Sequence, residues 1–149
     1  MKKIDNVTAG YVAGLIDGKG YFKYRFGYLT KQHKHEGAET YITVSSTYRP
    51  VLVYLQSTLD EGSIHRNPPK NPKHKMVWKW KLGPQGTFAL LHRIAPHLQI
   101  KLEAANLLLK NEALITKKGP RTESEKEILR RLGKKMADLT KRGVEGIQP

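Results

Sequence analysis

Two stretches of the sequence alternate basic residues with large apolar ones, a pattern that suits binding to a polyanion. The first stretch, residues 21–28, places Lys23 and Arg25 on the face opposite a row of aromatic side chains. The second stretch, residues 75–82, carries three lysines on one face: Lys75, Lys79 and Lys81. Because ammonium and guanidinium groups neutralise phosphates, two paired strands with this pattern would form a cationic platform for nucleic acid.

Other polar residues extend this platform. In residues 41–46, Ile42 and Val44 fall on the inner face, and three hydroxyl side chains fall on the outer face: Tyr41, Thr43 and Ser45. Hydroxyl groups form hydrogen bonds with phosphates and base edges. The connection after residue 63 adds further cations: Arg66, Lys70 and Lys73. We expect all of these residues to contact DNA, with a plain solvated surface as the alternative for both the strands and the loop.

The composition limits the class of protein. The chain has 149 residues, enough for a single domain over 1–149, and a formal charge of +14 that favours polyanionic partners. It contains no cysteine, which excludes disulfides and thiolate chemistry. No apolar run has the length of a membrane span or of a signal peptide. We therefore expect an intracellular protein with no targeting segment, in a prokaryotic cytoplasm or an organelle matrix, that binds DNA or RNA and no membrane.

Hydrophobic periodicity predicts an α+β chain in the order helix, two strands, helix, two strands, helices. The expected helices span residues 5–17, 50–62, 87–94, 100–115 and 123–141, the last being the core of a basic helix at about 121–142. The expected strands span residues 21–28, 41–46, 63–66 and 75–82. Such an order favours one antiparallel sheet with helices against one face.

The first expected helix contains glycines that need an explanation. Asn6 or Thr8 is expected to cap it, and Gly10 and Gly14 lie one turn apart in its middle. Each glycine costs a helix about 1 kcal/mol relative to alanine. The close approach of a second helix would offset this cost. We therefore predict a helix contact along the face that carries these two glycines, with packing inside the chain as the alternative.

Residues 11–22, with the sequence YVAGLIDGKGYF, resemble the signature of the LAGLIDADG homing endonucleases. A second stretch, residues 96–110, reads PHLQIKLEAANLLLK and is similar to the run PxLxxKxxxANLxLK of the small members that carry one motif per chain. Both matches occur in the correct order, and the region from the start of the first to the end of the second, residues 11–110, makes up about two thirds of the chain.

The resemblance implies a fold of order αββαββα, whose four-stranded antiparallel sheet forms a DNA-binding saddle. It also implies a homodimer in which the motif helices pack together, through residues Gly10, Ala13, Gly14 and Asp17. A two-fold dimer reads a pseudo-palindromic site of roughly two helical turns. The activity implied is magnesium-dependent double-strand cleavage of the homing site of an intron or intein.

The resemblance also locates the catalytic positions. Lys19 stands where active relatives have the acid that holds Mg²⁺, Ser46 lies near a glutamine that orients water, and Lys101 matches a pocket lysine. Asp17 matches the other motif acid, whose role is mostly structural. At an effective dielectric of about 20, a cation about 4 Å from a divalent ion is repelled by several kcal/mol. We therefore assign no metal ligand and expect the chain to bind its DNA and to cleave it poorly or not at all.

Two other functions stay open at this point. One is a binding-only protein, such as a repressor or a degenerate endonuclease. The other is an RNA maturase that assists intron splicing, because positive charge alone does not distinguish RNA from DNA.

Overall fold

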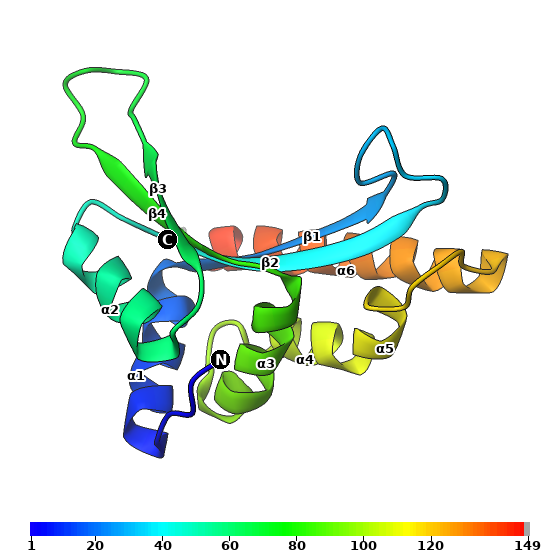
Figure 1. The fold of residues 1–149 in the computed structure, drawn as a ribbon, viewed down its shortest axis with the longest axis horizontal. Coiled ribbons are helices and arrows are strands. Elements are labelled where there is room, and N and C mark those ends of the chain that lie inside the picture. Colours follow the sequence, from blue (N-terminus) through cyan, green and yellow to red (C-terminus); the bar gives the residue numbers. More distant parts are fainter. Residues whose placement is uncertain (148–149) are drawn as a thin grey trace.

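The computed structural model describes the backbone of residues 1–147 and the side chains of residues 1–140. It is an α+β structure (Figure 1). The elements follow one another as α1 (Asn6–Lys19), β1 (Gly20–Gly27), β2 (Gly37–Ser46), α2 (Arg49–Leu59), β3 (Ser63–Asn67), β4 (Val77–Leu82), α3 (Pro84–Ile94), the 3₁₀ helix η1 (Ala95–His97), α4 (Leu102–Lys110), α5 (Glu112–Ile115) and α6 (Glu123–Ile147).

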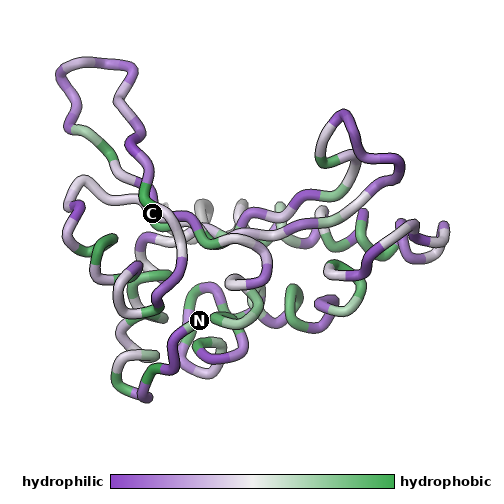
Figure 2. Tube along the Cα trace, viewed as in Figure 1, coloured by the Kyte–Doolittle hydropathy of each residue, from purple (hydrophilic) through white to green (hydrophobic). Residues whose placement is uncertain are grey.

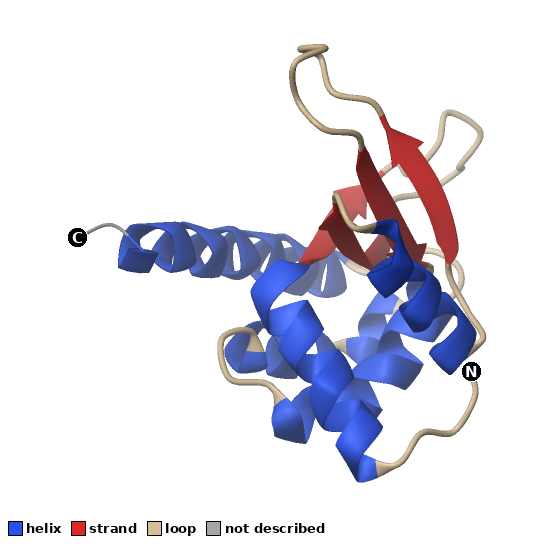
Figure 3. Cartoon of the chain, turned by 90° about the vertical axis from the view of Figure 1, so that its left-hand side faces the viewer, coloured by secondary structure: helices blue, strands red, loops and turns tan. Residues whose placement is uncertain are grey.

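The strands form a single antiparallel sheet in the order β1-β2-β4-β3. The helices lie against one face of this sheet, and the other face is open (Figure 3). The β1–β2 and β3–β4 hairpins rise at opposite ends of the molecule, so the open face is hollowed between them (Figure 1). The sheet therefore has the saddle shape that the sequence predicted.

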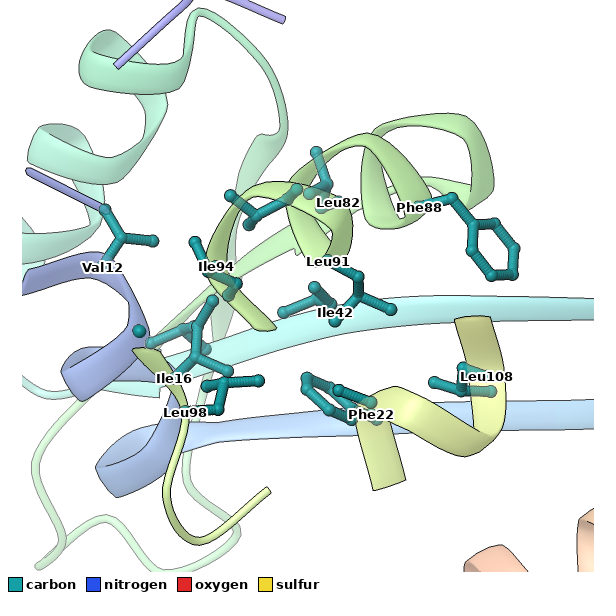
Figure 4. Close-up of a cluster of buried hydrophobic side chains, with 14 of the residues drawn as sticks. Val12, Ile16, Phe22, Ile42, Leu82, Phe88, Leu91, Ile94, Leu98 and Leu108 are labelled. Carbon is teal, nitrogen blue, oxygen red and sulfur yellow. The ribbon is translucent and has the colours of Figure 1, made fainter. Parts of the chain in front are cut away.

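The core lies between the helices and the inner face of the sheet. Val12 and Ile16 of α1 belong to the same hydrophobic cluster as Ile42 of β2, and all three are fully buried (Figure 4). Burial of an aliphatic side chain of this size stabilises a fold by about 1.5–3 kcal/mol. The loop between β3 and β4, in contrast, is almost uniformly hydrophilic (Figure 2). The apolar side chains of the sheet thus hold the helices in place and leave the outer face to polar groups.

Three local expectations were wrong. Strand β2 begins at Gly37, four residues before the expected start, because Gly37, Ala38 and Glu39 pair with the end of β1. The expected helix at residues 100–115 is divided at Asn111 into α4 and α5.

The N-cap of α1 is Asp5, and neither Asn6 nor Thr8 fills that role. Its Oδ1 accepts a hydrogen bond from the backbone N–H of Thr8 at 2.7 Å. This hydrogen bond favours the charged carboxylate and lowers the pKa of Asp5. Asp5 therefore satisfies an N–H group that the first turn of a helix leaves without a partner.

Trp80 fixes the turn that leads from α2 into β3. Its indole N–H donates to the carbonyl of Glu61 at 3.1 Å, and its ring occupies the place where residue 62 would carry a Cβ. Gly62 also has a φ of +90°, a left-handed conformation that glycine adopts readily. Only glycine satisfies both conditions at this position.

We expect Gly62→Ala to destabilise the protein by about 1–3 kcal/mol more than Gly119→Ala. Both glycines have a left-handed φ, but a Cβ at Gly119 meets nothing within 4 Å. The difference between the two variants thus isolates the collision with Trp80 from the cost of the backbone conformation. Urea unfolding of both variants measures it, and equal free energies of unfolding would contradict the account.

Candidate nucleic-acid interface

The outer face of the sheet carries the cationic rows that the sequence predicted. Lys23 and Arg25 lie on the open side of β1, opposite the inward Phe22. Strand β4 contributes Lys79 and Lys81 to the same face. Between them, β2 presents its hydroxyl side chains: Tyr41, Thr43 and Ser45.

The strand register brings these rows side by side. Tyr41 pairs with Lys23, Thr43 pairs with Lys81, and Ser45 pairs with Lys79. The Lys81 ammonium lies 4.2 Å from the centroid of the Tyr41 ring, which is a cation–π contact. Hydroxyl groups and ammonium groups therefore alternate across the middle of the platform.

Arg25 has a partner that the sequence analysis missed. Its Nε donates to Oε1 of Glu39 at 3.1 Å, and its Nη2 donates to the same oxygen. Nη2 also donates to the backbone carbonyl of Leu29 at 3.2 Å. Burial and the neighbouring Glu39 raise the pKa of Tyr41 to about 12. The signal for the Arg25–Glu39 pair was present in the sequence, but it required the β1–β2 register.

Arg66 lies in a strand and not in the connection between the last two strands where we expected it, and it does not share the platform. It belongs to β3, and its register partner is Trp78 of β4. Its guanidinium lies 5.9 Å from the Trp78 ring centroid, and Arg49 approaches the same ring at 5.3 Å. The side chains of β3 that share the outer face with Lys79 and Lys81 are instead Ser63, His65 and Asn67.

The remaining predicted cations lie in the connection between β3 and β4. Lys75 precedes the first residue of β4 and therefore lies off the sheet. Lys70 and Lys73 are exposed in the same connection. These three lysines are placed to reach a partner that rests on the platform, at the end of the sheet near α1 and α2 (Figure 1).

Lys19 is the last residue of α1 and is exposed. The C-terminal end of a helix carries partial negative charge, so a lysine is favourable here by about 0.3–1 kcal/mol. Gly20, which follows it, allows the chain to turn directly into β1, because a Cβ there would collide with the backbone of Ile16. The geometry thus fixes residue 19 at the junction of the helix and the sheet.

Asp17 connects α1 to the segment before α4. One carboxylate oxygen accepts from the backbone N–H of Gln99 at 2.7 Å, and the other accepts from the backbone N–H of Lys101 at 3.0 Å. The Lys101 ammonium donates to the backbone carbonyl of Asp17 at 2.9 Å, and burial lowers the pKa of Lys101. These contacts hold the end of α1 to the segment before α4.

Ser46 is the buried last residue of β2, and its Oγ accepts a hydrogen bond from the backbone N–H of Tyr48 at 3.0 Å. Among the side chains of residues 1–140, no hydrogen bond joins Ser46 to Lys19 or Lys101. The three positions that the resemblance assigned to catalysis are therefore not connected within one chain.

The donor groups at this junction do not fit a magnesium ion. Mg²⁺ prefers oxygen ligands, whereas residue 19 supplies an ammonium group. Each oxygen of Asp17 already accepts a hydrogen bond from a backbone N–H group, which directs the carboxylate toward the segment before α4. Within the described part of the chain, no three His, Asp or Glu side chains gather as a metal site would require.

We expect Asp17→Ala to destabilise the protein by about 2 kcal/mol, since the backbone N–H groups of Gln99 and Lys101 would both lose a charged acceptor. Asp138→Ala is the matched control, because Asp138 is exposed on α6 and forms no ion pair with the side chains of residues 1–140. Thermal and urea unfolding of the two variants provide the comparison. A loss no larger than that of Asp138→Ala would show that the Asp17 contacts do not hold α1 to this segment.

One face of α1 is left open. A Cβ added at Gly10, Gly14 or Gly18 would meet nothing within 4 Å. Beside this stripe, Val7 and Tyr11 are 83% and 52% exposed. The glycines therefore gain nothing from packing within the chain.

Two residues predicted for the same contact lie elsewhere on α1. Ala13 is fully buried in the core of its own chain, so it does not belong to the open stripe. Asp17 is engaged with the segment before α4, as described above. The open stripe of α1 thus comprises Val7, Gly10, Tyr11, Gly14 and Gly18.

No family model matches the sequence, and no curated protein is significantly similar to it. No helix within residues 1–147 is long and apolar enough to cross a bilayer. Solved structures, however, share the architecture at low sequence identity.

The homing endonuclease I-CvuI in complex with a DNA target is 18% identical, with a TM-score of 0.60 over 85% of this chain and 95% of that chain. The archaeal intron-encoded homing endonuclease I-Vdi141I, complexed with DNA, is 20% identical, with a TM-score of 0.58 over 91% of this chain and 84% of that one. The homing endonuclease I-TnaI is 15% identical, with a TM-score of 0.57 over 99% and 100%. These likenesses show a shared fold.

Proposed function

We propose that this chain, which has the fold of the LAGLIDADG homing endonucleases, binds a specific double-stranded DNA site as a homodimer. The observation that carries the proposal is the cationic outer face of the sheet, where Lys23, Lys79 and Lys81 stand among hydroxyl side chains. The solved structures of I-CvuI and I-Vdi141I, which share the fold, contain DNA.

The shape and charge of the platform suit the major groove of a duplex. The groove is about 12 Å wide and admits a β-ribbon, whose outward side chains can then reach base edges. Lysines at the same level neutralise phosphates and supply the part of the affinity that does not depend on sequence. The formal charge of +14 steers the protein to any nucleic acid, and the hydroxyl side chains of β2 provide the means of selection.

The open stripe of α1 supports the homodimer. A helix face of bare backbone with exposed Val7 and Tyr11 is suited to a second copy of itself, because small residues allow two helices to approach closely. Two saddles related by a two-fold axis would follow one groove for about two turns. The site should therefore be pseudo-palindromic, as expected of an intron or intein homing site.

DNA cleavage by the protein with lysine at position 19 should be weak or absent. I-CvuI has been solved with Mg and with Ca, but the junction of α1 and β1 here offers an ammonium group in place of a carboxylate. We expect Lys19 to contact the phosphate nearest the two-fold axis in place of a metal ion. Such a contact adds affinity and contributes no hydrolysis.

Selection of bound sequences from a randomised duplex library tests this function. Salt above about 0.2 M should be used, because nonspecific phosphate binding falls steeply with salt. We expect a pseudo-palindromic consensus of about two turns. Binding that fades with salt and leaves no consensus, or a preference for A-form RNA over duplex DNA, would overturn the proposal.

A further inference from the structure

Glu39 is the one carboxylate in the four strands, and it lies on the platform. An acid beside phosphates weakens binding to DNA, and here it also neutralises Arg25. A cross-strand ion pair at a surface contributes only about 0–1 kcal/mol to stability. This gain does not explain why a cation on the proposed DNA-binding face is neutralised. A direct role of this carboxylate in reading DNA would explain its position.

The Glu39 side chain is held in one orientation. Arg25 donates two hydrogen bonds to Oε1 and is itself fixed by the carbonyl of Leu29. On the other side lies Tyr41, whose ring carries the ammonium of Lys81 at 4.2 Å. The Glu39 side chain is 15% exposed, so it is restrained by its neighbours and still reaches the surface.

The Glu39 carboxylate keeps the capacity to accept a further hydrogen bond. It has about four acceptor sites, of which Arg25 uses two, both on Oε1, and the Tyr41 hydroxyl uses one. In the major groove, cytosine presents an N4 amino donor, whereas guanine and thymine present acceptors that would repel a carboxylate. Adenine also has an amino group, but its N7 acceptor lies beside it.

We propose that Glu39 selects cytosine at one base pair in each half-site, and that Arg25 is the positioning residue that orients its carboxylate. This inference rests on the proposed function, because it requires the platform to lie in the major groove. It names a determinant of sequence preference, in addition to the lysines that bind phosphates.

The register of the sheet gives the approximate place of this base pair. The Arg25–Glu39 pair lies five residues along β1 from Gly20. At about 3.3 Å per residue this is about 17 Å. Since the bases of a duplex are about 3.4 Å apart, the cytosine should lie about five base pairs farther from the two-fold axis than the base pair above Gly20.

The test compares selected binding sites of the wild-type protein, Glu39→Gln and Glu36→Gln. Glu36 provides the matched control, since it precedes β2, pairs with Lys126 and loses the same charge on substitution. We expect the wild-type preference for cytosine at the two symmetric positions to be about 5- to 100-fold over guanine or thymine. Glu39→Gln should remove this preference or shift it to adenine, and Glu36→Gln should leave the consensus unchanged.

A second variant tests the positioning role of Arg25. Arg25→Gln should broaden the preference at the same two positions while Glu39 remains present. Identical consensus sequences for wild type and Glu39→Gln would overturn the role of Glu39 and leave the proposed function intact. A wild-type consensus without cytosine at symmetric positions would also overturn it. If wild type yields no consensus, the proposed function itself fails.

Discussion

If the chain binds DNA as proposed, replacement of Lys19 by aspartate is expected to turn it into a magnesium-dependent nuclease. The variant removes the ammonium group that repels a divalent ion and places a carboxylate at the end of α1, in both subunits of a dimer. Oxygen ligands suit Mg²⁺, and a bound ion both activates water and stabilises the leaving oxygen. Cleavage of a plasmid that carries the selected site should rise by at least about 100-fold over wild type.

The appropriate control is Lys19→Gln, which removes the positive charge and adds no carboxylate. It should bind DNA and leave the plasmid intact with or without Mg²⁺. Lys19→Asp should also lower the free energy of unfolding by about 0.3–1 kcal/mol or slightly more, because an acid is unfavourable at a helix C-terminus. A Lys19→Asp protein that binds the site and never cuts it would show that Lys19 alone does not block cleavage.

Replacement of Gly14 by leucine is expected to abolish the dimer and, with it, binding to the full site. Nothing within the chain lies within 4 Å of a Cβ at this position, so the variant should fold as well as wild type. The loss of a helix glycine adds up to about 1 kcal/mol of stability. The leucine side chain would, however, keep a second α1 helix from approaching. Sedimentation velocity should show a monomer where wild type shows a dimer.

Ala137→Leu serves as the control for Gly14→Leu. Ala137 is exposed on α6, so the substitution adds apolar volume to a helix away from the stripe. It should leave both the dimer and DNA binding unchanged. If Gly14→Leu dimerises as wild type does, the stripe of α1 is not the contact between subunits.

Local patterning was sufficient to predict the two faces of the sheet. The alternation of Phe22 with Lys23 and of Trp80 with Lys81 fixed which side chains are buried, because successive residues of a strand point to opposite faces. The same periodicity located α1 within two residues of its observed ends. The four strands and their order along the chain therefore followed from the sequence.

Register and long-range contacts were beyond local patterning. Arg66 lies on the inner face of the sheet because it pairs with Trp78. The Arg25–Glu39 pair forms because β2 starts earlier than expected. Neither can be derived from one strand alone, since a shift of one residue exchanges the faces. Asp17 meets Gln99 across 82 residues of sequence, a contact that neither the local pattern nor the resemblance to a family predicted.

The most direct test of the central claim is the number of protein chains on one selected duplex. Native mass spectrometry of the wild-type protein with its pseudo-palindromic consensus should show two chains per duplex. The same measurement with Gly14→Leu should lose this species. A single chain of wild-type protein on the full site would contradict the account of a two-fold dimer that reads DNA through paired saddles.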